Sequence, residues 1–326
     1  MDQRLELLKR WLKNDAGMAS FDIAPASSDA SFRRYFRVRL GDESYIVMDA
    51  PPERENCQPY IKVARAMASI GLNVPHIFRS DLAQGFLLLS DLGVRSYLEV
   101  LNETNVGRLY GDALDALLIL QSRRADIKDG LPSYNRSLLA DEMGLFRDWY
   151  LQRYLGVVLN AGQRKVLDES YEVLIQSALE QPLVQVHRDY HSRNLMVVEN
   201  NNPGILDFQD AVMGPVTYDL VSLLRDCYIQ WPRARVEAWA EEYRDRLEEG
   251  GVIDRVDRPQ FMRWFDLMGV QRHLKAIGIF SRLNIRDNKP GYLKDIPRTL
   301  GYVIEVSGHY PELGGLNTLL CELMNL

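Results

Sequence analysis

Cysteine is scarce in this chain, which has only Cys57, Cys227 and Cys321 among 326 residues. Their odd number and wide spacing predict neither a disulfide framework nor a zinc site, and favour thiols in a reducing compartment. No run of about 18 apolar residues occurs, so no membrane span is expected. Charged residues interrupt the apolar pattern of the opening segment, MDQRLELLKRWL, which is not typical of a signal peptide. We therefore expect a cytoplasmic protein.

An excess of positive charge is also missing, because the formal net charge is −6. This net negative charge argues against sequence-independent binding of nucleic acid. The apolar fraction of 46% and the charged fraction of 26% are ordinary for a globular protein and exclude a mostly disordered chain. The length suits about two domains. We expect no nucleic-acid partner, no membrane association and no obligate protein partner.

The first 89 residues carry most of the strand signals. Alternating apolar residues, a Gly41-Asp42 turn and the run Tyr45–Met48 predict a hairpin within residues 20–49, with Phe32, Phe36, Val38 and Leu40 on its first strand. Pro59 suits the first turn of a helix that Gly71 ends, and residues 86–89 predict a short buried strand.

Beyond residue 93 the pattern is mainly helical, with short strands expected at 183–186, 195–198 and 205–206. We predict an α+β fold with two lobes. The N-lobe, residues 1–89, holds a small antiparallel sheet with helices. Residues 90–93 form a connector, and residues 94–326 form a larger, mainly helical C-lobe.

The most informative stretch is VHRDYHSRNLMVVENNNPGILDFQD, residues 186–210. Asp189 lies between two predicted strands, Asn194 follows five residues later, and Asp207 closes the next hairpin. Phosphoryl transfer needs a positioned metal and a group that takes the acceptor proton, and oxygen ligands of this kind suit Mg²⁺. The alternative is that these residues are turn and cap residues. Three such residues between apolar strands favour the chemical role.

HRDYHSRN with LDFQD resembles the catalytic and metal-binding loops of the protein-kinase-like fold. The connector LLSDLG and the Tyr218-Asp219-Leu220 segment are similar to those of the aminoglycoside phosphotransferase and choline kinase superfamily. Within it, four motifs resemble the bacterial anomeric N-acetylmuramate/N-acetylglucosamine kinases of cell-wall recycling: DASFRRYFR, IVMDAPPE, LDFQDA and GPVTYDLVSLLRDCY.

The resemblance implies a two-lobed protein-kinase-like fold and a kinase that transfers the γ-phosphoryl group of ATP to the anomeric hydroxyl of an amino sugar. It implies that Asp189 is the catalytic base, that Asn194 and Asp207 bind Mg²⁺, and that His187 braces the loop. Backbone groups of Ser90, Asp91 and Leu92 would meet adenine, although these residues could equally be a plain linker. Asp219 could cap or anchor a helix as readily as serve the site.

One departure from the protein-kinase pattern concerns the lysine of the third strand, whose place is taken here by Met48. The following helix, residues 56–70, contains no Asp or Glu, so both members of the usual ion pair are missing together. The protein could therefore be an inactive, nucleotide-binding relative. Otherwise another cation meets the phosphates, and the segment SFRRYFRVR next to a loop of small residues is the candidate source. We expect Ser31 and either Arg33 or Arg34 to bind the nucleotide. A solvated basic edge strand is the alternative.

The acceptor site in this superfamily is built mainly from C-lobe helices. Residues 252–300 contain ten basic and five acidic residues, which disfavours a polycationic aminoglycoside and tolerates an N-acetyl sugar with a lactyl carboxylate. We predict sugar contacts from Arg272 and His273, and from Gln209 and Asp210 beside the metal loop. The alternative is that these groups face solvent. An amino alcohol, another sugar or an aminoglycoside remains an alternative acceptor.

Overall fold

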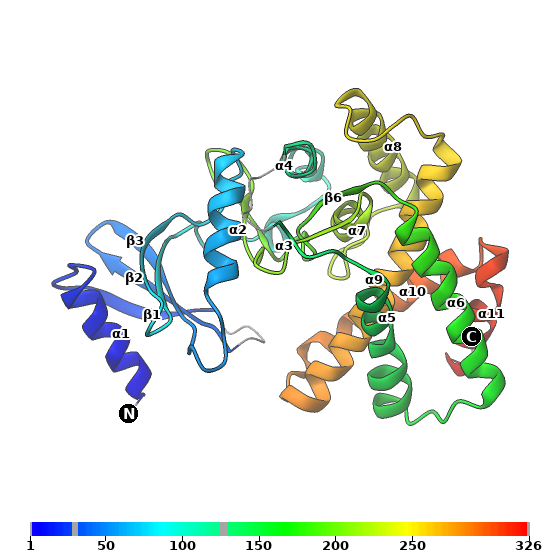
Figure 1. The fold of residues 1–326 in the computed structure, drawn as a ribbon, viewed down its shortest axis with the longest axis horizontal. Helices are drawn as coiled ribbons and strands as arrows, with labels where there is room; N and C mark the ends of the chain where they lie inside the picture. The colour runs from blue at the N-terminus through cyan, green and yellow to red at the C-terminus, as the bar shows by residue number, and fades with distance from the viewer. Residues whose placement is uncertain (1, 28–31, 124–129, 325–326) are drawn as a thin grey trace.

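The computed structural model describes residues 2–27, 32–123 and 130–324. The chain forms two lobes (Figure 1), a sheet-containing N-lobe and a larger helical C-lobe. This confirms the predicted fold class. Within the described residues, no helix combines the length and the apolar character that crossing a bilayer would need.

The N-lobe is built on a five-stranded antiparallel sheet of order β1-β2-β3-β5-β4. Its strands are β1 (Asp22–Ser27), β2 (Arg34–Leu40), β3 (Glu43–Asp49), β4 (Ile77–Asp81) and β5 (Phe86–Ser90). Gly41, with a φ of 60°, makes the predicted turn between β2 and β3. Phe32 was predicted to lie on the first hairpin strand, but it lies outside β2 and is 58% exposed.

Two helices cover opposite faces of this sheet (Figure 1). Helix α1 (Gln3–Asn14) packs Leu8, Trp11 and Leu12 against the face that carries Phe36 and Val38. Helix α2 (Gln58–Ser69) belongs to the main core, together with Met48 of β3 and residues of β5. Met48 is fully buried there, so at this position the third strand has an uncharged side chain that belongs to the core.

The C-lobe is mainly helical and carries two short two-stranded sheets, β6 (Leu183–Val186) with β9 (Val212–Pro215), and β7 (Leu195–Met196) with β8 (Gly204–Ile205). Its helical elements are α3 (Tyr97–Val100), α4 (Val106–Ser122), α5 (Arg136–Leu145), the π-helix η1 (Phe146–Tyr154), α6 (Ala161–Leu179), α7 (Tyr218–Leu224), α8 (Arg233–Glu249), α9 (Arg258–Asp287), the short η2 (Pro290–Asp295), α10 (Ile296–Ser307), η3 (Pro311–Leu313) and α11 (Gly314–Met324).

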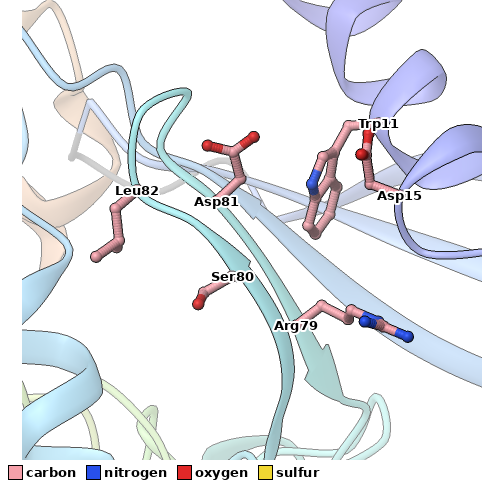
Figure 2. A pocket seen from close by; sticks show the side chains of 6 residues that line it. All are labelled: Trp11, Asp15, Arg79, Ser80, Asp81 and Leu82. Atoms are coloured by element: carbon pink, nitrogen blue, oxygen red, sulfur yellow. The ribbon is translucent and has the colours of Figure 1, made fainter.

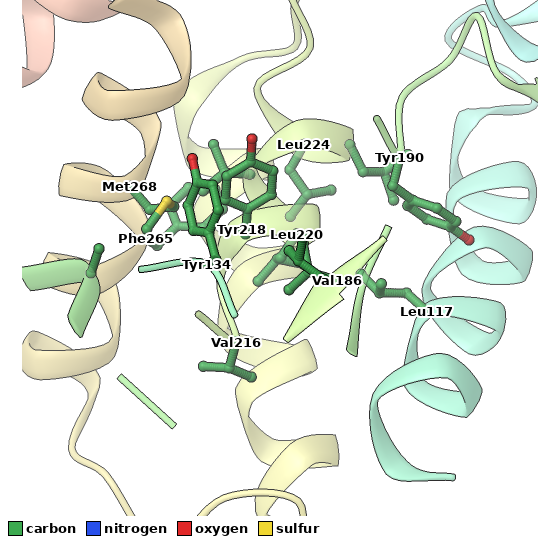
Figure 3. Packing of buried hydrophobic residues seen from close by; sticks show 14 of the residues in the cluster. Leu117, Tyr134, Val186, Tyr190, Val216, Tyr218, Leu220, Leu224, Phe265 and Met268 are labelled. Carbon is green, nitrogen blue, oxygen red and sulfur yellow. The ribbon is translucent and has the colours of Figure 1, made fainter. Parts of the chain in front are cut away.

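Helix α9 is central to the packing of the C-lobe, because it contacts α5, α6, α7, α8 and α10. The Asp257 side chain caps its first turn by accepting a hydrogen bond from the Gln260 N–H at 2.9 Å. Phe265 and Met268 of α9 pack in the core near Tyr134 and Tyr218 (Figure 3). The loops that join β6 to α7 therefore rest on a continuous apolar base.

Candidate active site

The segment after β6 is anchored at its start by a buried carboxylate. Asp219, in the first turn of α7, accepts hydrogen bonds from the N–H groups of His187 at 2.6 Å and Arg188 at 3.0 Å. Arg188 has a φ of 79°, an unfavourable backbone conformation for a residue with a side chain. The two hydrogen bonds hold this turn, and the turn sets the direction in which the next residue, Asp189, leaves the strand.

A second buried carboxylate anchors the far end of the same loop. Asp226 accepts hydrogen bonds from the N–H groups of Ser192 and Tyr228, each at 2.9 Å. Both carboxylates are almost fully buried. Backbone N–H groups that lack a strand or helix partner are thus satisfied by side chains. The loop from Asp189 to Asn194 is held at both ends.

The β7–β8 pairing brings the predicted metal ligands together. Leu195 pairs with Ile205, and the N–H of Leu206 donates to the carbonyl of Asn194 at 2.9 Å, so Asn194 lies beside the residue that precedes Asp207. The Asn194 amide donates to the Asp189 carbonyl at 3.0 Å, which leaves its own oxygen as an acceptor. Gln209 donates to Asp207 Oδ1 at 2.9 Å.

This donor set fits a hard cation such as Mg²⁺, because it offers an amide oxygen and a carboxylate on adjacent loops. Among the described residues, no group of three or more His, Cys, Asp or Glu side chains could hold a metal by itself. Mg²⁺ usually keeps several waters and shares its remaining ligands with substrate phosphates. A site with two protein ligands is consistent with that preference.

A buried polar network lies beneath the loop. Glu142 of α5 forms ion pairs with Arg188 and with Lys275 of α9, the latter at 3.0 Å. Tyr134 donates a hydrogen bond to Glu142, and Lys275 donates to the Tyr218 hydroxyl at 3.0 Å. The rings of the two tyrosines (Figure 3) meet edge to face, with their centroids 5.1 Å apart. Buried charges in this network are therefore paired.

The predicted base, Asp189, is ionised at neutral pH. Burial alone would raise the pKa of Asp189, but neighbouring positive charges, chiefly that of Lys275 and also that of Arg272, outweigh burial and lower it. Arg272 itself is fixed, because it donates to the Arg188 carbonyl at 2.8 Å and to the Ser222 hydroxyl at 2.6 Å. Arg272 thus contacts the loop through the Arg188 carbonyl, and its predicted contact with the sugar stays a prediction.

The structure separates the two candidate arginines of the N-lobe. Arg33 forms an ion pair with Glu55 at 3.1 Å. Burial lowers the pKa of Arg33, but the charges of neighbouring groups, among them Glu55, Asp207 and Asp210, raise it overall. Arg34 lies on the opposite face of the sheet, where it pairs with the buried Asp49 and with Asp2 of the α1 N-terminus. The structure does not bring Arg34 to the site.

The connector residues have defined partners. Ser90 accepts a hydrogen bond from the His76 N–H at 2.8 Å through its hydroxyl. The Asp91 carboxylate accepts hydrogen bonds from Arg37 at 2.6 and 3.0 Å, and from Ser44 at 2.5 Å. The Asp91 side chain thus ties the connector to β2 and β3. Leu92 packs close to Gly204. A Cβ atom added at Gly204 would lie 3.0 Å from the Leu92 Cδ1 atom.

Of the remaining predicted residues, Gln209 and Asp210 lie near Asp207, and His273 does not. Gln209 is buried beside Asp207, and Asp210 is exposed next to it. His273 is 2% exposed, stacks on Tyr302 and bonds to the Arg225 carbonyl at 2.9 Å, on another side of α9 from Arg272. The structure therefore does not bring His273 to the loop. Ser31 lies outside the described residues.

Sequence reasoning missed Glu142, Asp226 and the role of Lys275. Glu142 is distant in sequence from the loop that it supports, and no local pattern marks it. A signal for Lys275 was present, because residues three apart share one face of a helix, whereas adjacent residues do not. Arg272 and Lys275 form such a pair, and Arg272 and His273 do not.

The Asp219 contacts predict a trade-off between stability and turnover in the Asp219→Asn variant. Burial raises the pKa of Asp219 to about 7, despite its two N–H donors and Arg272. An acid whose folded pKa exceeds its unfolded pKa makes unfolding easier as pH rises between the two values. From about pH 4 to about pH 7, the difference in melting temperature between Asp219→Asn and the parent should move in the variant's favour.

Turnover should fall in this variant, because an amide offers only one acceptor oxygen to the two N–H groups. Melting curves at several pH values and kcat at about pH 8, above the folded pKa, measure the two effects. A pH-independent difference in melting temperature would contradict the burial of an ionised Asp219. An unchanged kcat would contradict its positioning of the loop.

A hollow lies apart from these loops, at the edge of the N-lobe sheet (Figure 2). It has a volume of about 570 Å³ and is lined by Trp11, Asp15, Arg79, Ser80, Asp81 and Leu82. These residues belong to α1, β4 and the adjoining turns. None of the predicted catalytic or metal-binding residues lines this hollow. The candidate active site is therefore the group of loops described above, and the hollow is not part of it.

The chain matches the model of the phosphotransferase enzyme family over residues 22–262. It is 46% identical to the N-acetylmuramate/N-acetylglucosamine kinase of Pseudomonas putida, over 99% of this chain and 97% of the relative. It is 49% identical to the protein of the same name from Pseudomonas aeruginosa, over 93% and 88%. The kinase of that name from Neisseria meningitidis is 41% identical over 99% and 96%.

Solved structures share the fold at low sequence identity. Choline kinase LicA from Streptococcus pneumoniae superposes with a TM-score of 0.64 at 10% identity, over 92% of this chain and 99% of that structure. The ADP-bound aminoglycoside phosphotransferase APH(2'')-Ib gives 0.62 at 16% identity, over 94% and 99%. The family model covers most of the chain, including both loops of the site, and the three kinases match almost all of it. The chain belongs to the phosphotransferase enzyme family.

Proposed function

We propose that this protein transfers the γ-phosphoryl group of ATP to the anomeric hydroxyl of an amino sugar, N-acetylmuramate, N-acetylglucosamine or both. Family membership makes the protein a phosphotransferase. The sugar is supported by relatives of 41–49% identity that share the name N-acetylmuramate/N-acetylglucosamine kinase. The observation that carries the proposal is the arrangement of three residues: the β7–β8 pairing brings Asn194 beside Asp207, and the Asn194 amide donates a hydrogen bond to the Asp189 carbonyl.

In this proposal, the Asp189 carboxylate accepts a hydrogen bond from the sugar hydroxyl and orients it. It takes the hydroxyl proton as the sugar oxygen bonds to the γ-phosphorus and the bond from that phosphorus to the β–γ bridging oxygen breaks, which releases ADP. Asn194 and Asp207 would hold Mg²⁺, which neutralises charge on the phosphates when it is bound. Gln209 steadies the Asp207 carboxylate, and backbone groups of residues 90–92 receive the adenine. Asp210 remains a candidate for a sugar hydroxyl.

The proposed acceptor is tested by phosphorus NMR of mixtures of enzyme, ATP, Mg²⁺ and a sugar. We expect a phosphomonoester signal split by the anomeric proton. The methyl glycoside of N-acetylglucosamine, in which the anomeric hydroxyl is blocked, is the matched control and should give no product. A product with the blocked sugar, or transfer only to choline or an aminoglycoside, would overturn the proposal.

Arg33 is the cation that we propose to bind the nucleotide phosphates, because the third strand has Met48 where protein kinases have a lysine and contains no basic residue. Arg33→Ala should raise the KM for ATP by about 10- to 100-fold, as expected for loss of a charge-assisted hydrogen bond. Arg34→Ala is the matched control, because Arg34 is the next residue in sequence and lies on the opposite face of the sheet. It should leave the KM for ATP near that of the parent and lower the melting temperature, because Asp49 loses a partner.

The measurement is initial velocity against ATP concentration at saturating sugar. Equal KM values for Arg33→Ala and the parent would remove Arg33 from the nucleotide site. A raised KM in Arg34→Ala alone would reverse the assignment.

A further inference from the structure

A pocket opens beside the loop that carries Asp189. Its volume is about 330 Å³, and it is lined by Leu98, Arg193, Tyr228, Lys294, Asp295 and Arg298. Arg193 directly precedes the proposed metal ligand Asn194. The Leu98 N–H donates to the Ser192 carbonyl at 3.0 Å, so a second lining residue is tied to the same loop. Two of the lining residues are therefore on, or hydrogen-bonded to, the loop that carries Asp189 and Asn194.

Arg193 is held in this pocket by two aromatic rings. Its guanidinium carbon lies 4.9 Å from the centroid of Tyr228 and 5.0 Å from that of Tyr292. Tyr228 in turn packs edge-on to His191, with ring centroids 5.3 Å apart. Stacking on the flat faces restricts the guanidinium, and the N–H donors of this group lie in its plane. Such a preformed donor edge suits a planar anion such as a carboxylate.

The charge of the pocket is uneven. Three basic side chains, Arg193, Lys294 and Arg298, face one acid, Asp295. Arg298 is fixed by donating to the Cys227 carbonyl at 2.7 Å and to Asp295 at 3.1 Å. The lining residues therefore carry a net formal charge of +2. The pocket thus combines cations for an anion with one carboxylate that can accept a hydrogen bond from a hydroxyl or amide.

We propose that this pocket binds the lactyl carboxylate of N-acetylmuramate, with Arg193 as the main contact and Lys294 as a supporting charge. The inference rests on the proposed function, because it assigns the part of the acceptor that lies away from the phosphorylated hydroxyl. The lactyl ether is carried two ring carbons from the anomeric carbon, so it lies away from the hydroxyl that Asp189 orients in the proposed function. N-acetylglucosamine has no lactyl carboxylate, so it does not pair with the positive charges of Arg193 and Lys294.

The test compares kcat/KM for the two sugars in the parent, in Arg193→Gln and in Arg193→Lys. The ratio of N-acetylmuramate to N-acetylglucosamine should fall by about 10- to 100-fold in Arg193→Gln, the range expected for a hydrogen bond to a charged group. Arg193→Lys keeps the positive charge but loses the planar guanidinium that stacks on the two tyrosine rings. It should give an intermediate ratio. Lys294→Gln should lower the ratio by a smaller factor.

Arg136→Gln is the matched control, because Arg136 is an exposed arginine that pairs with Glu172 on the α5–α6 surface. It should leave the ratio unchanged. In the parent, added salt should raise the KM for N-acetylmuramate more than that for N-acetylglucosamine. Melting curves and the KM for ATP show whether each variant is folded.

The outcomes separate the inference from the proposed function. If the parent phosphorylates both sugars and the ratio stays constant in Arg193→Gln and Lys294→Gln, the inference alone is overturned. A parent active only on N-acetylglucosamine also overturns it. If the parent gives no anomeric phosphate of either sugar, the proposed function fails and the inference fails with it.

Discussion

Replacing Asp189 with Asn should lower kcat by about 10²- to 10⁴-fold and leave nucleotide binding intact. The range is that of a lost general base. The substitution keeps the size of the side chain, and the Asp189 carbonyl that accepts from Asn194 is part of the backbone and is retained. Because Asp189 reaches neither the adenine nor the N-lobe loop in the proposed mechanism, the affinity for ATP should change little.

The measurement is single-turnover transfer to N-acetylglucosamine, combined with calorimetric titration of a non-hydrolysable ATP analogue. Asp245→Asn, an exposed acid of α8 that pairs with Arg244, is the control and should behave like the parent. A kcat within a few-fold of the parent in Asp189→Asn would refute the assignment of the base. The pKa of Asp189 is lowered, so its protonation should not limit activity between about pH 5 and about pH 9.

Replacing Gly278 with Ala should destabilise the C-lobe strongly, although the change adds only one methyl group. A Cβ at this position of α9 would lie 2.4 Å from the carbonyl carbon of Leu145 and 2.6 Å from the N atom of Phe146. Both are backbone atoms at the junction of α5 and η1, so no side chain can rotate aside. Overpacking of this kind costs about 1–3 kcal/mol or more.

Gly301→Ala offers a control of opposite sign. Gly301 lies in α10, and a Cβ there would meet nothing within 4 Å. Alanine is favoured over glycine inside a helix by about 1 kcal/mol, so this variant should melt higher than the parent. Denaturant unfolding of both variants measures the difference. Similar stabilities for Gly278→Ala and Gly301→Ala would contradict the close crossing of α9 over α5.

Several features of the fold and the site could be predicted from local sequence. The alternation at Phe36 and Val38 places the hairpin, and Pro59 with Gly71 bounds the helix that the structure places at Gln58–Ser69. The β7–β8 pairing brings Asn194 beside Asp207, in keeping with their predicted common site, although their roles stay predictions. These features depend on neighbours within about twenty residues, where periodicity and turn chemistry are informative.

Long-range contacts could not be read in the same way. Strand alternation separates Arg33 from Arg34, but it does not say which face meets the cleft. That choice depends on α1 docking behind the sheet, where Asp2 and Asp49 receive Arg34. Glu142 is 46 residues from Arg188 in sequence, so only the folded chain pairs them. The boundaries proposed for the lobes, 1–89, 90–93 and 94–326, also stay predictions.

The two carboxylates that pin the loop have a consequence for the work of catalysis. Asp219 and Asp226 fix its two ends, and the Glu142–Lys275 pair supports it from below. The desolvation of these charges is complete once the chain has folded. Little reorganisation free energy then remains for the moment when charge develops on the transferred group. The cost of orienting the base is met once per molecule, at folding, instead of once per turnover.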